Sequence, residues 1–199
     1  MTWVKVCGLS RRADVMAAVE SGADAVGFVL AESPRRVSPE TARNLSAGVT
    51  IERVLVTVDA LPDQLMEWVD LTGASGVQPH GLNSTEAGDA ALAGGLLVLH
   101  PLPVRSIIDL ADLAHDRLPL FDTFRSDSHG GTGEQFDWTL LDGIERDFVL
   151  AGGLGPDNVA DAIARVAPWG VDASSGLESA PGVKDPGLIR RFVTEAKKR

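Results

Sequence analysis

Short apolar runs alternate with amphipathic stretches along the chain. The first apolar run, at 4–9, ends on Cys7-Gly8-Leu9, and a helical stretch and a second apolar run at 25–30 follow it. The second run shows no alternation of apolar and polar positions, which is typical of parallel strands that helices cover. A strand, a helix and a strand within the first thirty residues predict a right-handed βαβ unit.

The same pattern continues to the end of the chain. We predict strands at 4–7, 25–30, 54–58, 76–78, 95–99, 118–122, 147–150 and 170–173. Helices are expected at 11–21, 38–45, 62–71, 84–93, 104–114, 156–166 and 186–198, with a short helix near 138–141. Ser10, Ser38 and Ser84 are the predicted N-caps of three of them.

Eight βα units in one chain predict an α/β protein with a single catalytic domain over residues 1–199. The fold that fits them is a minimal closed (β/α)8 barrel, a TIM barrel with short loops. An open doubly wound sheet is the structural alternative. It is disfavoured because the strands are evenly spaced and no Gly-x-Gly-x-x-Gly follows the first strand.

Charge and composition narrow the class of protein. The chain carries 18 Lys and Arg against 28 Asp and Glu, a net charge of −10 that argues against binding nucleic acid or an anionic membrane surface. A single cysteine excludes an internal disulfide, and the four histidines lack metal-binding spacing. No apolar run approaches the roughly 20 residues that span a bilayer, and no signal peptide precedes the first strand. We therefore expect a cytoplasmic protein.

In a barrel of this type the active site lies at the carboxyl ends of the strands. Cys7 ends the first strand and is either a buried packing residue or a reactive thiol. Asp122 ends the sixth strand, where a carboxylate is either a loop cap or an acid in a desolvated site. Arg35 is either a solvated loop charge or a fork that binds a carboxylate. Alternation along the first strand turns Lys5 inward with Cys7, and Asp172 on the adjacent last strand is its expected structural partner.

Glycine-rich loops follow the seventh and eighth strands, at 151–158 and 173–178. Loops at these two positions form the recurrent phosphate site of TIM barrels, where bare backbone amides approach the anion. A third glycine run, at 130–133, could close over the same end. Glycines also terminate strands without binding anything, but two loops at the expected positions favour a phosphate site.

Six motifs, in order from Val4 to Asp185, resemble those of phosphoribosylanthranilate isomerases. They are VKVCGL at 4–9, GADAVGFV at 22–29, SPR with VSP at 33–39, GGTG with FDW at 130–138, LAGGL at 150–154, and VDASSGLE with PGVKD at 171–185. The resemblance implies a cofactor-free and metal-free TIM-barrel enzyme of tryptophan biosynthesis that performs an Amadori rearrangement of a phosphorylated small molecule. It identifies Cys7 as the general base, Asp122 as the general acid and Arg35 as the contact for the anthranilate carboxylate. The residues expected at the phosphate end are Gly131, Gly152, Gly153, Asp172, Ser174, Ser175 and Gly176.

The chain departs from the family pattern near the mouth of the barrel, at Pro79, at His100-Pro101 and at 123–125, and these departures could alter substrate affinity. Two alternatives stay open. A sister phosphate-binding barrel would share the late glycine loops, but it is expected to have other residues at the strand ends. A pseudoenzyme would keep the loops without the chemistry. The sequence is compatible with a monomer or a homodimer.

Overall fold

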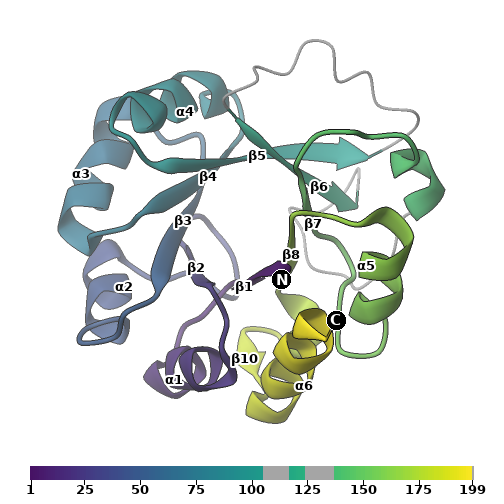
Figure 1. The fold of residues 1–199 in the computed structure, drawn as a ribbon. Helices are drawn as coiled ribbons and strands as arrows, with labels where there is room; N and C mark the ends of the chain where they lie inside the picture. The colour runs from purple at the N-terminus through teal and green to yellow at the C-terminus, as the bar shows by residue number, and fades with distance from the viewer. Residues whose placement is uncertain (105–116, 124–136, 199) are drawn as a thin grey trace.

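The computed structural model describes residues 1–104, 117–123 and 137–198, and it contains a closed barrel of eight parallel strands (Figure 1). The strands are β1 (Trp3–Val6), β2 (Ala25–Val29), β3 (Glu52–Val58), β4 (Gly76–His80), β5 (Leu97–Val104), β6 (Leu118–Thr123), β7 (Val149–Leu150) and β8 (Gly170–Ala173). Each strand pairs with the next along the chain, and β8 pairs with β1 to close the ring. The predicted barrel is confirmed, and the open sheet is wrong.

Helices cover the outside of the barrel (Figure 1). They are α1 (Arg12–Ser21), α2 (Pro39–Leu45), α3 (Pro62–Thr72), α4 (Ser84–Ala93), α5 (Val159–Val166) and α6 (Pro186–Lys197), with 3-10 turns η1 (Trp138–Leu141) and η2 (Ser175–Leu177). The helix predicted at 104–114 lies outside the described residues except for its first residue, which belongs to β5.

Of the three predicted N-caps, only Ser38 is confirmed. Its hydroxyl accepts a hydrogen bond from the Thr41 backbone amide. The N-caps of α1 and α4 are Arg11 and Asn83, so the predictions for Ser10 and Ser84 were wrong by one residue. The Ser10 hydroxyl instead donates a hydrogen bond to the carbonyl of Gly182, 172 positions away. Such a tertiary contact carries no local sequence signal.

Strand β5 is longer than predicted, because it continues past Leu99 through Pro101 and Pro103. Proline lacks a backbone N–H, so a strand tolerates it at positions where no neighbouring strand needs a hydrogen bond from that residue. Here β5 pairs with β4 only at Leu97 and Val98, whereas its pairing with β6 runs from 99 to 104. His100, expected in the loop after the strand, therefore lies within β5 opposite Pro119, with its buried Nδ1 lacking a partner among the described residues.

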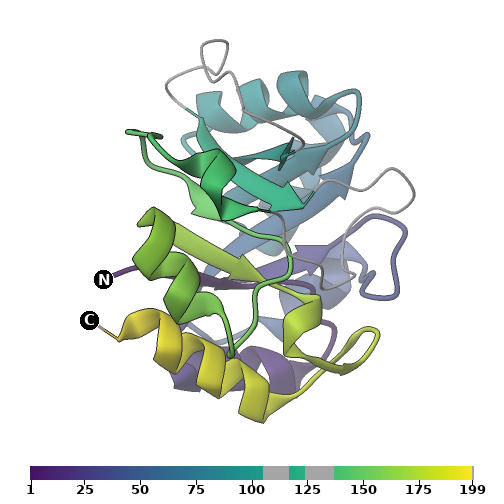
Figure 2. The same ribbon diagram turned by 90° about the vertical axis from the view of Figure 1, so that its right-hand side faces the viewer.

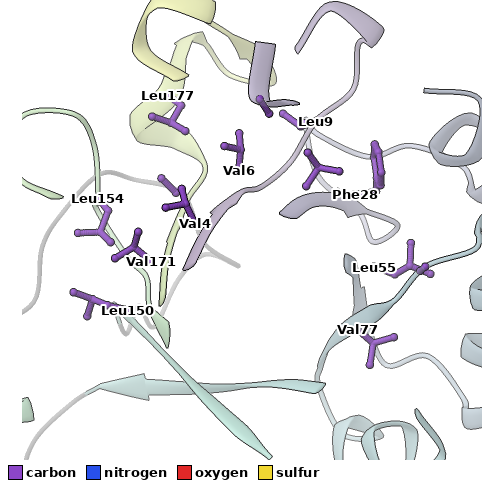
Figure 3. Packing of buried hydrophobic residues seen from close by; sticks show 14 of the residues in the cluster. Val4, Val6, Leu9, Phe28, Leu55, Val77, Leu150, Leu154, Val171 and Leu177 are labelled. Atoms are coloured by element: carbon purple, nitrogen blue, oxygen red, sulfur yellow. The ribbon is translucent and has the colours of Figure 1, made fainter. Parts of the chain in front are cut away.

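The barrel has two hydrophobic layers, one on each face of its strands. The larger one lies between strands and helices and includes Val4, Phe28, Leu55 and Leu150 (Figure 3). The smaller one fills the barrel interior with Ala25, Val54, Leu99, Leu120, Val149 and Ala151. Because side chains alternate along a strand, the outward positions of Val4 and Val6 turn Lys5 and Cys7 inward. Asp122 faces inward for the same reason, two residues after Leu120.

A small antiparallel hairpin follows η2 and was not predicted. It consists of β9 (Glu178–Ala180) and β10 (Val183–Lys184), joined through Gly182 at φ +76°. A side chain at Gly182 would come within 2.5 Å of the Pro34 carbonyl oxygen, so the hairpin packs directly on the loop after β2. Figure 2 shows the hairpin at the barrel end opposite the two termini. Among the described helices, none is long and apolar enough to cross a membrane.

Candidate active site

Cys7 lies immediately after β1, with its backbone N–H donated to the Ala173 carbonyl on β8 at 2.9 Å. The residue is 6% exposed. A carbon added at Gly27 on neighbouring β2 would stand 2.7 Å from Cys7 Sγ. The missing side chain of Gly27 therefore makes the space that the thiol occupies.

The charges around Cys7 act in opposite directions on its thiol. Burial raises the pKa of Cys7 above its ordinary value, because a buried thiolate is poorly solvated. The cationic side chains of Lys5 and Lys184 lower the same pKa, and Asp172 raises it further. The net direction is upward, so the neutral thiol is favoured more than in an ordinary cysteine.

A charged layer crosses the barrel one level below Cys7. Lys5 Nζ, which is fully buried, donates to Asp172 Oδ2 and to Gln78 Oε1, each at 2.8 Å. Gln78 Nε2 in turn lies 3.2 Å from His80 Nε2 at the end of β4. The predicted pairing of Lys5 with Asp172 is confirmed, and it follows from the register of β1 against β8.

The loops after β1, β2 and β8 converge at Gly8, whose φ of +75° favours glycine. A carbon added there would lie 2.5 Å from Arg35 Cδ and 2.9 Å from Ser174 Oγ. Gly8 thus allows the strand to turn away after Cys7 and also allows Arg35 and Ser174 to approach.

Arg35 forms a two-pronged ion pair with Glu178 of the hairpin. Its Nε donates to Oε1 at 2.6 Å and its Nη2 to Oε2 at 2.8 Å. Lys184 Nζ, fully buried, donates to the same Oε1 at 2.8 Å and to the Ser174 carbonyl at 2.8 Å. One carboxylate therefore holds two cations beside the mouth of the barrel, and the reading of Arg35 as a solvated loop charge is wrong.

The ionisation of this cluster follows from its contacts. Burial alone would raise the pKa of Glu178, but the hydrogen bonds and charges of Arg35 and Lys184 outweigh it and lower the pKa. Burial lowers the pKa of Lys184, and Glu178 only partly offsets that effect.

The two late glycine loops touch each other through their backbones. Gly152 and Gly153 adopt φ values of +82° and +67°. A carbon added at Gly176 would lie 2.1 Å from the Leu154 carbonyl oxygen, so this crossing requires glycine. Asn158 braces the first loop by accepting from the Gly155 amide and donating to the Gly153 carbonyl.

Several backbone amides of these loops remain available to a ligand. Those of Gly152, Gly153, Ser175 and Gly176 donate to no oxygen among the described residues. Around the ring, β7 and β8 lie between β6, which ends near Asp122, and β1, which ends near Cys7. In the order around the ring, the glycine loops thus follow the strands between those of Asp122 and Cys7, and the loop that carries Arg35 follows β2 on the other side of β1.

A model of the N-(5'-phosphoribosyl)anthranilate isomerase family matches residues 4–195. The chain belongs to this family. It is 44% identical to the N-(5'-phosphoribosyl)anthranilate isomerase of Citrifermentans bemidjiense, over 100% of this chain and 98% of that protein. It is 42% identical to the isomerase of Rubrobacter xylanophilus, over 99% and 100%.

Solved structures of phosphoribosylanthranilate isomerases have the same fold. The Thermotoga maritima enzyme superposes with a TM-score of 0.89 at 38% identity, over 99% of each chain. A second structure is a complex with reduced 1-(o-carboxyphenylamino)-1-deoxyribulose 5-phosphate, and it superposes with a TM-score of 0.86 at 36% identity, over 99% of each chain.

Apart from Asp172, the described residues that the sequence predicts for the active site of this isomerase family member lie at the carboxyl end of the barrel. Gly131 lies outside the described residues, so its expected position stays a prediction. Asp172 lies deeper, where its Oδ2 binds Lys5. Glu178 and Lys184 were missed, although both stand within the last of the motifs that resemble the family. A buried glutamate and lysine in a polar loop have no periodic signal, and only their mutual contact reveals them.

Proposed function

We propose that the chain is a cofactor-free isomerase that converts N-(5'-phosphoribosyl)anthranilate into 1-(2-carboxyphenylamino)-1-deoxyribulose 5-phosphate in tryptophan biosynthesis. The observation that carries this proposal is the family match over residues 4–195. The positions of Cys7 and Asp122 at the same end of the barrel support it, because the reaction needs an acid and a base around one sugar.

Asp122 is the general acid in this proposal. Its carboxyl proton moves to the ribose ring oxygen, the bond between that oxygen and C1′ breaks, and the anthranilate nitrogen forms a Schiff base with C1′. This step requires a protonated carboxyl.

Cys7 is the general base. As a thiolate it removes the proton from C2′ of the Schiff base, and the electron pair moves to form an enolamine. The enolamine then tautomerises to the ketone, so the substrate and product have the same atoms. The absence of a side chain at Gly27 leaves room for the sulfur itself.

The two ends of the substrate have separate anchors. The free amides of Gly152, Gly153, Ser175 and Gly176 are suited to the phosphate. Arg35 is suited to the anthranilate carboxylate, because Glu178 holds only its Nε–Nη2 edge and no hydrogen bond engages Nη1 within residues 1–104, 117–123 and 137–198. We infer that the whole chain, residues 1–199, acts as one catalytic domain in the cytoplasm, as a monomer or a homodimer.

The proposal is tested by replacing the acid and the base separately. Cys7→Ser and Asp122→Asn should each lower kcat by at least about 100-fold while KM changes little, because a lost general acid or base costs 10²–10⁴ in rate. Turnover is followed by the loss of anthranilate fluorescence. Ser179→Ala, on the exposed face of the hairpin, is the control that should retain activity.

Near-normal turnover in either variant would remove that residue from its role. Wild-type protein that binds the product analogue but never turns over the substrate would identify a pseudoenzyme instead.

A further inference from the structure

Lys5 is a fully buried charged side chain that the proposed mechanism leaves unused. Its ammonium lies inside the barrel with no exposed surface, where an uncompensated charge is very costly. Asp172 and Gln78 hold it from two other strands, each at 2.8 Å. Asp172 Oδ1 is buried without a hydrogen-bond partner among the described residues, so Lys5 is the cation that neutralises this carboxylate.

The same lysine side chain lies beside the thiol. Lys5 lies on β1, Cys7 follows two positions later, immediately after the strand, and both face inward. A carbon added at Gly27 would stand 2.7 Å from Cys7 Sγ and 3.1 Å from Lys5 Cε. The sulfur and the end of the lysine side chain therefore both lie next to the position that a Gly27 side chain would take.

We propose that Lys5 is a positioning residue for the isomerisation, whose ammonium, fixed by Asp172 and Gln78, stabilises the sulfur anion that Cys7 forms. Lys5 does not touch the substrate in this proposal. It acts through Cys7. The proposal rests on the proposed function, which gives the Cys7 thiolate its role as the general base.

The charged groups that face Cys7 come from three strands. Lys5 approaches from β1, Asp172 from β8 and Lys184 from β10, while β2 contributes the uncharged Gly27. Among the effects on the pKa of Cys7, the charge of Lys5 is second only to burial and is larger than the opposing charge of Asp172. Burial lowers the pKa of Lys5, but the charge and hydrogen bond of Asp172, together with Cys7, outweigh it and the net direction is upward, which favours the charged ammonium.

The sequence allows the proposal to be tested without measuring turnover. Cys7 is the only cysteine, and the chain has no tyrosine whose ionisation would overlap that of a thiolate. The ultraviolet absorbance of the thiolate, titrated against pH in the folded protein, therefore reports on one group. Lys5→Met should raise the midpoint of this titration by about 1–3 pH units, the usual effect of a neighbouring opposite charge.

Two further variants control for folding. Lys197→Met removes another lysine–aspartate pair, with Asp24, which lies away from Cys7, and it should leave the thiol midpoint unchanged. Where Lys5→Met fails to fold, the double variant Lys5→Met/Asp172→Leu removes both buried charges together, a replacement that proteins often tolerate. Its midpoint should also rise, by less than in the single variant, because an opposing charge has been removed as well.

An unchanged or lower midpoint in the folded variants would overturn the proposal and leave Lys5 with a structural role only. This result is separate from the proposed function, because wild-type turnover is measured independently. A wild-type protein without isomerase activity, combined with a shifted midpoint, would refute the function and keep the electrostatic coupling.

Discussion

Glu178 offers the sharpest test of the electrostatics at the mouth of the barrel. Its carboxylate accepts from Arg35 and Lys184, and the side chains of these two cations are only 11% and 0% exposed. Glu178→Gln keeps the size of the side chain and removes its charge, which leaves the buried Lys184 without an anion. Removing one partner of a buried ion pair costs about 3–5 kcal/mol.

We expect the free energy of unfolding to fall by about 3 kcal/mol, at the lower end of this range, because Lys184 retains the Ser174 carbonyl as an acceptor. The measurement is urea unfolding at pH 7, in which the midpoint falls while the slope stays constant. Asp157→Asn is the matched control. Its partner is Arg191, both side chains are mostly exposed, and such surface pairs contribute less than about 1 kcal/mol.

The difference in the free energy of unfolding between wild type and Glu178→Gln should also depend on pH. The pKa of Glu178 is lowered in the folded protein, so its stabilising effect is complete above the ordinary range of a glutamate pKa. This stabilisation is lost as the pH falls through the folded-state pKa of Glu178, so the difference in the free energy of unfolding between the two proteins becomes smaller. A loss below about 1 kcal/mol at pH 7, or a gap that is independent of pH, would refute this reasoning.

Two glycines with close neighbours give the remaining predictions. Gly176→Ala should destabilise the fold by about 1–3 kcal/mol and weaken inhibition by inorganic phosphate, because the new carbon would lie 2.1 Å from the Leu154 carbonyl oxygen. Gly155→Ala, where the contact is an ordinary 3.4 Å, is its control in the same unfolding assay, and equal losses would contradict the argument. Gly27→Ala should lower kcat more than it raises KM, because its methyl group would displace Cys7 Sγ. Unchanged steady-state kinetics would show that the thiol can move aside without losing its function.

The order of strands and helices was predictable because it depends on local patterns. Apolar runs, helix caps and glycine ends repeat along the chain, and eight units close into a barrel. The end of β5 was not predictable in this way. Pro101 and Pro103 indicate a loop when read alone, and only the loss of pairing with β4 makes them compatible with a strand.

The candidate site divides along the same line. Lys5 and Asp172 could be paired from the sequence because alternation and ring closure bring β1 beside β8. The cluster of Arg35, Glu178 and Lys184 could not, because it depends on a hairpin that folds back over the loop after β2. Contacts of this kind join residues 143 positions apart, and neither propensity nor periodicity encodes them.

The central claim is the isomerase activity, and steady-state turnover by the purified wild-type protein tests it most directly. N-(5'-phosphoribosyl)anthranilate is supplied, and its fluorescence is followed without added metal or cofactor. We predict a loss of fluorescence whose rate is proportional to the protein concentration, saturates with substrate and is abolished by Cys7→Ser. A fluorescence that decays no faster with the protein than without it would contradict the account.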